Sequence, residues 1–291
     1  DPTSVTTLQA RFYLLQLYLR SREVDAAIRE LRALGELGRE WHLHEVIWIH
    51  DRLSLQESFY EANFEHVVTG LRELYRRSQK HGLRFGDRYA KVCASQLQRE
   101  LGVEIDPPIL PSEKIATLPW SMVLWQARAV REAAEEGRHA DARTDLARLA
   151  RSGFRDVPRD GVYLATLAEL SLAVCALDAK EHASTLFDLL RPYAQHHAMD
   201  EFFFSLGSIA YYLGILALLL DERSTALAQL EAALEMNQRL RHRPQIMRSR
   251  LALAACLLRE PKQPAQRRAI ELLRGVHSEA RALGLIVSAP S

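Results

Sequence analysis

The stretch ALAQLEAALEMNQRL, residues 226–240, decides the fold because its spacing recurs along the chain. Ala226, Leu230 and Ala233 are four and three residues apart, so they lie on one face of a helix. The same order, a small residue followed by apolar residues four and seven positions later, occurs at five other places. We call the first residue of each set an anchor, and the anchors are Ala27, Val67, Ala142, Ala183, Ala226 and Ala269.

The anchors define a repeat of about 42 residues. Successive anchors are 40, 75, 41, 43 and 43 residues apart, and 75 is close to two steps with one degenerate unit between them. Such a period accommodates two helices and two short turns. An apolar stretch that predicts the first helix of a pair precedes most anchors, at 7–19, 45–58, 121–134, 162–177 and 208–220.

Neither helix of such a pair can bury its apolar face alone, so the pairs must stack. The sequence therefore predicts an all-α superhelix, an α-solenoid of about seven helical pairs. The alternative is a compact, irregular helical domain, against which the even spacing argues. No alternation of apolar and polar residues is long enough to predict a strand.

Turn residues agree with this division. Arg22, Gly137, Asp178 and Asp221 each stand five residues before an anchor, where the first helix should end. The segment 102–119, GVEIDPPILPSEKIATLP, contains four prolines and no helical periodicity. We expect it to be a hinge or packed excursion between two helical-repeat arrays, at 1–101 and 120–291.

Composition limits the classes of function. The formal net charge of +1 provides no global field that would attract nucleic acid or a membrane surface. No apolar run approaches the roughly 18 residues of a membrane-spanning helix, and the first residues lack the layout of a signal peptide. The three cysteines are widely separated and lie in helical patterns. We expect a cytoplasmic protein with reduced thiols.

Several stretches resemble known repeat proteins. The anchors after each turn, with Gly214 in the preceding helix, resemble tetratricopeptide repeats, although the period exceeds the standard 34 residues. Residues 186–258, from LFDLLRPYA through YLGILALLL and ALAQLEAALEMN to LALAACLL, resemble the C-terminal arrays of bacterial signal-transducing ATPases of the AAA/STAND type. GFRDVPRDGVYLATLAEL at 153–170 resembles the preceding unit of those arrays. LQRELGVEID at 97–106 resembles the end of the bacterial transcriptional activator domain.

In that family the repeats are joined to an ATPase and to an adenylate cyclase or DNA-binding output domain. The chain itself has no GxxxxGK[ST] phosphate loop, no cyclase metal-carboxylate signature and no evident helix-turn-helix reader. The resemblance therefore implies a tetratricopeptide-like, right-handed superhelix that regulates signalling or transcription and is not an enzyme. Its expected partners are a protein or peptide, or a small anionic effector, and an ATPase or output domain in the same or another chain.

Two other functions remain open at this point. The first is a stand-alone adaptor, scaffold or chaperone-like binding protein with no output domain. The second is a helical enzyme, although no grouping of Ser, His and Asp, or of Cys and His, is evident in the sequence. Membrane binding is not expected, and nucleic-acid binding by this chain alone is disfavoured by its small net charge.

The candidate binding residues are aromatic and basic. Phe204 and Tyr211 belong to a first helix and either pack in the core or line a concave face. From Met236 to Arg259 there is no acidic residue, so Arg248 and Arg250 could offer forked donors to an anion. Aromatic faces beside these arginines suit an acidic peptide or a nucleotide-like molecule.

A second candidate is WHLHEVIWIH, residues 41–50. Trp41 and Trp48 are seven residues apart and would share one helical face, either as core residues or as a recognition surface. The three histidines of this stretch cannot all reach one metal ion from a single helix, so no metal site is predicted. No cofactor is predicted either.

Overall fold

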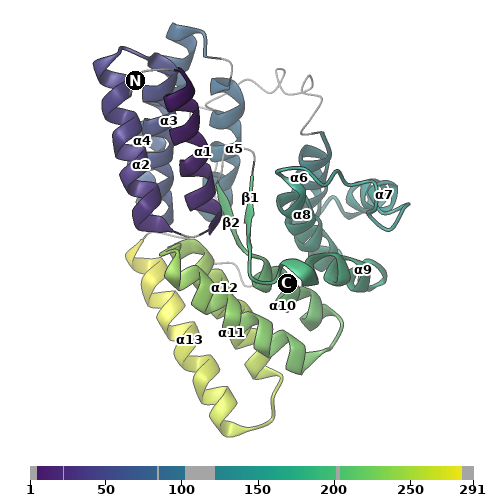
Figure 1. Ribbon diagram of the computed structural model, residues 1–291. Helices are drawn as coiled ribbons and strands as arrows, with labels where there is room; N and C mark the ends of the chain where they lie inside the picture. The colour runs from purple at the N-terminus through teal and green to yellow at the C-terminus, as the bar shows by residue number, and fades with distance from the viewer. Residues whose placement is uncertain (1–4, 22, 84, 102–121, 201–203, 284–291) are drawn as a thin grey trace. The chain divides into compact units, whose positions relative to one another are not determined.

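The computed structural model is mostly helical and describes residues 5–21, 23–83, 85–101, 122–200 and 204–283 (Figure 1). The expected hinge at 102–119 and the turn residue Arg22 lie outside the described residues. The chain divides into two compact units. Helices α1–α5 belong to the first unit, and the elements from α6 onward belong to the second, apart from residues 240–244, which are grouped with the first.

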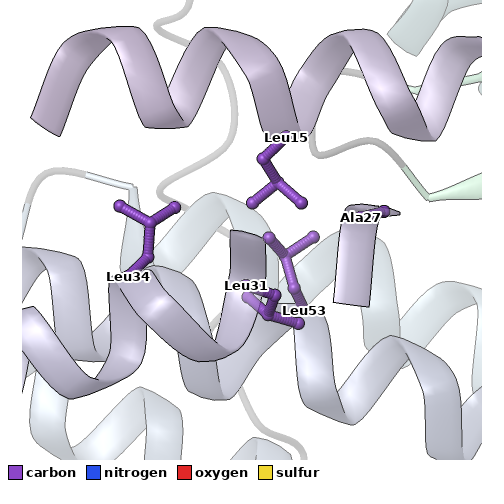
Figure 2. Packing of buried hydrophobic residues seen from close by; sticks show 5 residues of the cluster. All are labelled: Leu15, Ala27, Leu31, Leu34 and Leu53. Carbon is purple, nitrogen blue, oxygen red and sulfur yellow. The ribbon is translucent and has the colours of Figure 1, made fainter. Parts of the chain in front are cut away.

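In the first unit each helix packs against the next one along the chain, from α1 to α5. Buried leucines of the first helices form its core, with Leu15 and Leu53 meeting Ala27, Leu31 and Leu34 (Figure 2). The helices are α1 (Val5–Ser21), α2 (Val24–Glu40), α3 (His44–Tyr60), α4 (Phe64–His81) and α5 (Gly86–Leu101).

The second unit contains helical pairs and one β-hairpin. Helix α8 packs against both α6 and α10, and the pairs α6–α7, α8–α9 and α10–α11 are also in contact. The elements are α6 (Met122–Glu135), α7 (His139–Leu149), α8 (Tyr163–Ala176), α9 (Lys180–Leu190), η2 (Arg191–Tyr193), β1 (His197–Met199), β2 (Ser205–Ser208), α10 (Ile209–Leu219), α11 (Arg223–Arg239), α12 (Arg243–Leu258) and α13 (Gln263–Ala282).

The same turn closes helices in both units. In each turn one residue just past the helix takes a positive φ, and the backbone N–H of the next residue donates to the carbonyl five residues before it, which is the Schellman arrangement. Gly137, Asp178 and Asp221 have φ values of 80°, 49° and 60°, so three of the expected turn residues end first helices. The backbone N–H of the first residue donates to the carbonyl of the second in these pairs: Leu43 and Gly38, Asn63 and Ser58, Leu83 and Ser78, Arg138 and Ala133, Ala179 and Val174, Glu222 and Ala217.

All six anchors are buried, as the repeat pattern predicts. Ala27 is 4% exposed, and Val67, Ala142, Ala183, Ala226 and Ala269 are 0% exposed. Their partners are less uniform, because Leu149, Phe187 and Leu273 are only partly buried. The anchor positions therefore mark contact faces more reliably than the positions that follow them.

The β-hairpin corrects the expectation that the chain contains no strand. β1 and β2 pair antiparallel, with His197 opposite Ser208 and a register shift after Ala198. Gly207 has a φ of 109°, a conformation that side chains disfavour. Strands of three and four residues are too short to produce a recognisable alternation, which is why the sequence does not predict them.

Candidate functional site

The aromatic residues proposed for ligand contact lie in the core of the second unit. Phe204 is 2% exposed and Tyr211 is 5% exposed, and the Tyr211 ring packs edge-on against Tyr212. Neither side chain lines an exposed concave face, so that reading of the sequence is corrected. The alternative reading, core packing, is the arrangement observed.

The two arginines of α12 do not form an uncompensated basic pair. Arg250 donates from Nη1 to Glu279 Oε2 of α13 at 2.8 Å, and both side chains are partly buried. Arg248 is partly exposed. The sequence could not reveal this ion pair, since Glu279 follows Arg250 by 29 residues and belongs to another helix.

Trp41 and Trp48 do not share a helical face, which corrects a second expectation. Helix α2 ends at Glu40 and α3 begins at His44, so Trp41 lies in the turn and is 46% exposed. His42 breaks the helix with a φ of 52°. Trp48 is 4% exposed and its Nε1 donates to the Leu74 carbonyl at 3.3 Å. It is a core residue that joins α3 to α4.

The second unit contains a buried charge network that sequence reasoning missed. Arg128 and Arg131 of α6 both bind Glu169 of α8, at 3.1 Å from Arg128 Nε and 2.6 Å from Arg131 Nε. Arg128 Nη2 also lies 3.4 Å from Asp200 Oδ2, beside the hairpin. These four side chains are 2% exposed or less, so two positive and two negative charges are buried together.

Charge pairing keeps Arg131 ionised. Burial by itself lowers the pKa of Arg131. The carboxylates of Glu169, Glu135 and Glu132 raise the pKa by a larger amount, so it lies above the usual arginine value. The Arg128 guanidinium also lies over the Trp125 ring, 5.3 Å from its centroid. Since both Glu169 oxygens accept from arginines of α6, this carboxylate is placed to hold α6 and α8 together.

Asp200 extends the network into the hairpin. Its Oδ1 accepts a hydrogen bond from the Phe204 backbone N–H at 2.9 Å, while its Oδ2 faces Arg128. At the other end of the hairpin, Ser208 N–H donates to Asn237 Oδ1 of α11 at 3.1 Å, and Asn237 Nδ2 donates to Ser249 of α12 at 3.0 Å. Buried polar bonds therefore link the hairpin segment directly to α6 and α11, and through Asn237 to α12.

One sequence feature could have indicated the network. Glu169 is the only charged residue in α8, whose sequence YLATLAELSLAVCA is otherwise small or apolar. A single acidic residue in a buried helix requires a cationic partner. The partners themselves, which precede it by 38 and 41 residues, require the structure.

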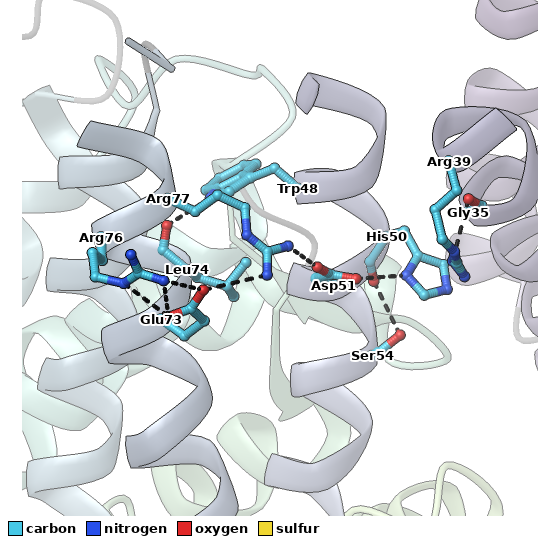
Figure 3. A network of polar contacts seen from close by, with 10 residues as sticks. All are labelled: Gly35, Arg39, Trp48, His50, Asp51, Ser54, Glu73, Leu74, Arg76 and Arg77. Atoms are coloured by element: carbon cyan, nitrogen blue, oxygen red, sulfur yellow. Dashed lines mark hydrogen bonds and ion pairs between the residues drawn. The ribbon is translucent and has the colours of Figure 1, made fainter. Parts of the chain in front are cut away.

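The first unit has a more exposed polar network between α3 and α4 (Figure 3). Asp51 contacts Arg77 of α4, and His50 Nδ1 lies 2.9 Å from Asp51 Oδ1. Burial raises the pKa of Asp51, but hydrogen bonds from His50 and Arg77 outweigh it, so the pKa is below the usual aspartate value. Ser54 Oγ donates to the backbone carbonyl of His50 and not to its ring, so these residues do not form a nucleophilic triad.

Burial raises the pKa of the Cys175 thiol to about 12 and also raises the pKa of the Cys256 thiol. Cys93, Cys175 and Cys256 form no disulfide. A thiol with a raised pKa is a poor nucleophile near neutral pH. Within the described ranges, no group of three or more His, Cys, Asp or Glu side chains is placed to hold a metal ion. None of the helices described has both the length and the apolar character needed to cross a bilayer.

Comparison of the chain with protein-family models, with curated proteins and with solved structures returns no match. Its function is therefore inferred from its own residues.

Proposed function

We propose that this chain is a regulatory helical-repeat module that binds a protein partner and performs no covalent chemistry of its own. Stacked helical pairs would present an extended surface, and binding would shift how the pairs pack against an output domain. Small displacements between neighbouring pairs add along a stack, so binding at one pair would shift the position of a distant pair.

The contacts of α8 are the observation that carries this proposal. Helix α8 packs between α6 and α10, while each of these three first helices also contacts its own second helix. That pattern is typical of stacked helical pairs, whose period the buried anchors Ala142, Ala183 and Ala226 share. A compact bundle would instead bring all first helices around one centre.

The buried charge network supports a scaffold role. The pairing of Arg128 and Arg131 with Glu169 joins two successive first helices through charges that cannot be separated without a large desolvation cost. Such a contact favours one relative placement of α6 and α8. A module that transmits a signal by small shifts needs defined starting positions of this kind.

Turnover measurements test whether the chain has chemistry of its own. The purified full chain is expected to hydrolyse no ATP and to form no cyclic AMP, because its sequence has neither a phosphate loop nor cyclase metal carboxylates. ATP hydrolysis or cyclic AMP formation that coelutes with the chain through two orthogonal columns would overturn the proposal. A heat-denatured sample of the same preparation provides the control.

A further inference from the structure

In the second unit, a basic side chain near the start of α7, α9 and α11 contacts the end of the next first helix along the chain (Figure 1). Arg143 of α7 donates from Nη2 to the carbonyl of Leu177, the residue that follows α8. Arg223 of α11 donates from Nη1 to the carbonyl of Arg259, the residue that follows α12, at 3.2 Å. Helix α9 makes the corresponding contact through an ion pair, so the connection recurs in three successive helical pairs.

Asp221 connects two of these contacts. Its Oδ2 lies 3.6 Å from Lys180 Nζ at the start of α9, and its Oδ1 lies 3.5 Å from Arg259 Nη1 beyond the end of α12. The same Nη1 of Arg259 donates to the Leu218 carbonyl of α10 at 3.0 Å. Asp221 itself stands in the turn between α10 and α11, with a φ of 60°. One carboxylate therefore joins the pairs α8–α9, α10–α11 and α12–α13.

The basic residues stand where their own helices disfavour them. Lys180 and Arg223 are the first residues of α9 and α11, and a positive charge at the start of a helix is unfavourable to that helix. Both stand three residues before an anchor, so they are equivalent positions of the repeat. The end of the neighbouring first helix offers partial negative charge, which compensates. A local conflict that recurs at one position and is resolved by a contact between pairs indicates that the contact has a role in the array.

The ion pairs of Asp221 are accessible to water, unlike the buried network around Glu169. The side chains of Lys180, Asp221 and Arg259 are 54%, 67% and 47% exposed. Exposed ion pairs stabilise a fold little and are screened by salt. At about 1 M salt the screening length is about 3 Å, which is shorter than both ion-pair distances of Asp221. These contacts can therefore open without unfolding the helices that they connect.

We infer that Asp221 forms a salt-sensitive joint that sets the spacing of three successive helical pairs. With both ion pairs formed, the joint holds the start of α9 and the end of α12 at fixed distances from the turn after α10. Salt, or a charged group of a partner that competes for Lys180 or Arg259, would open the joint and let the spacing change. The inference rests on the proposed function, in which binding shifts how the pairs pack, and it assigns that shift to one residue.

Spin labels on the full chain measure the joint. Cys93, Cys175 and Cys256 are replaced by alanine, and labels are attached through Ser184→Cys in α9 and Arg267→Cys in α13, two exposed positions. Electron paramagnetic resonance then gives the distribution of distances between the pairs α8–α9 and α12–α13. Raising the salt from about 0.01 M to about 1 M shortens the screening length from about 30 Å to about 3 Å, and we expect it to broaden the distribution at least about 1.5-fold.

Matched variants separate the effect of the charge from that of the turn. Asp221→Asn removes the charge while asparagine still tolerates a positive φ, and it is expected to broaden the low-salt distribution as much as high salt broadens that of the wild type. Asp178→Asn is the control and should leave the distribution unchanged. Asp178 is exposed and has a φ of 49° in the equivalent turn after α8, and within the described part of the chain it forms no ion pair. If Asp221→Asn loses helical content by circular dichroism, Lys180→Gln opens the joint from α9.

Three results would rule out the joint: no broadening by high salt or by the loss of the charge, equal broadening in Asp178→Asn, or as much further broadening by salt in Asp221→Asn as in the wild type. The last result would mean that salt acts at another contact. All three concern the width of a distance distribution, whereas turnover tests the proposed function, so the two claims can fail separately.

Discussion

At the scale of single residues, small side chains set how closely paired helices approach. Ala226 is fully buried in α11, and its helix crosses α10 near Gly214. A Cβ atom added at Gly214 would lie 2.6 Å from Leu230 Cδ2 and 3.3 Å from the Leu230 backbone nitrogen. The first helix and the second helix therefore meet with little spare room, and any added volume must displace backbone.

Enlarging an anchor tests this packing. Ala226→Leu is expected to lower the free energy of unfolding by about 1–3 kcal/mol, because the added carbons overpack the contact between α10 and α11. Urea denaturation followed by circular dichroism measures the change. Ala228→Leu, at an exposed position two residues further along the same helix, is the control and should stay within about 0.5 kcal/mol of the wild type. Equal effects of the two substitutions would mean that the anchors have no special packing role.

At the scale of elements, the sequence predicts the helices well and the contacts between them poorly. Each predicted first helix is present, and Gly137, Asp178 and Asp221 end helices as expected, since local periodicity and turn chemistry depend on neighbouring residues. The pairing of Arg250 with Glu279 and the links from the hairpin segment to Arg128 and Asn237 depend on residues distant in sequence.

The candidate site was harder to predict than the fold for the same reason. The aromatic side chains of Phe204 and Tyr211 are compatible with a ligand-binding face and with a core, and only their exposed fractions in the structure distinguish the two. The Arg128, Arg131 and Glu169 network joins two helical pairs, so no single stretch of sequence contains it.

Breaking that network should be costly. Glu169→Gln removes the carboxylate that Arg128 and Arg131 share but leaves Arg128 with Asp200 and Arg131 with Glu135, so we expect it to destabilise the fold by about 1.5–3 kcal/mol. Thermal and urea unfolding of the full chain measure the loss. Glu181→Gln on α9, whose side chain is 65% exposed, is the matched control and should change stability by about 0.5 kcal/mol or less. A loss below about 1 kcal/mol for Glu169→Gln would show that the buried charges do not hold α6 to α8.

At the scale of the whole molecule, the account depends on how the first helices of the second unit succeed one another. Glu135, Ala176 and Leu219 are the last residues of α6, α8 and α10, and each stands seven residues before its anchor. These positions are therefore equivalent points in three successive repeats. In a stack, the distance from α6 to α10 is about the sum of the distances from α6 to α8 and from α8 to α10. Around a shared centre, the three distances between these helices are similar.

Electron paramagnetic resonance on the full chain measures these distances between helix ends directly. Spin labels are placed at Glu135 and Leu219 after Cys93, Cys175 and Cys256 are replaced by alanine, and a second sample labels the neighbouring pair Glu135 and Ala176. Packed helix axes are about 8–10 Å apart, so a stack predicts about 16–20 Å between α6 and α10, and roughly half that for the neighbours. A separation between α6 and α10 as short as that between α6 and α8 would contradict the stacked arrangement, and with it the proposal of a helical-repeat module.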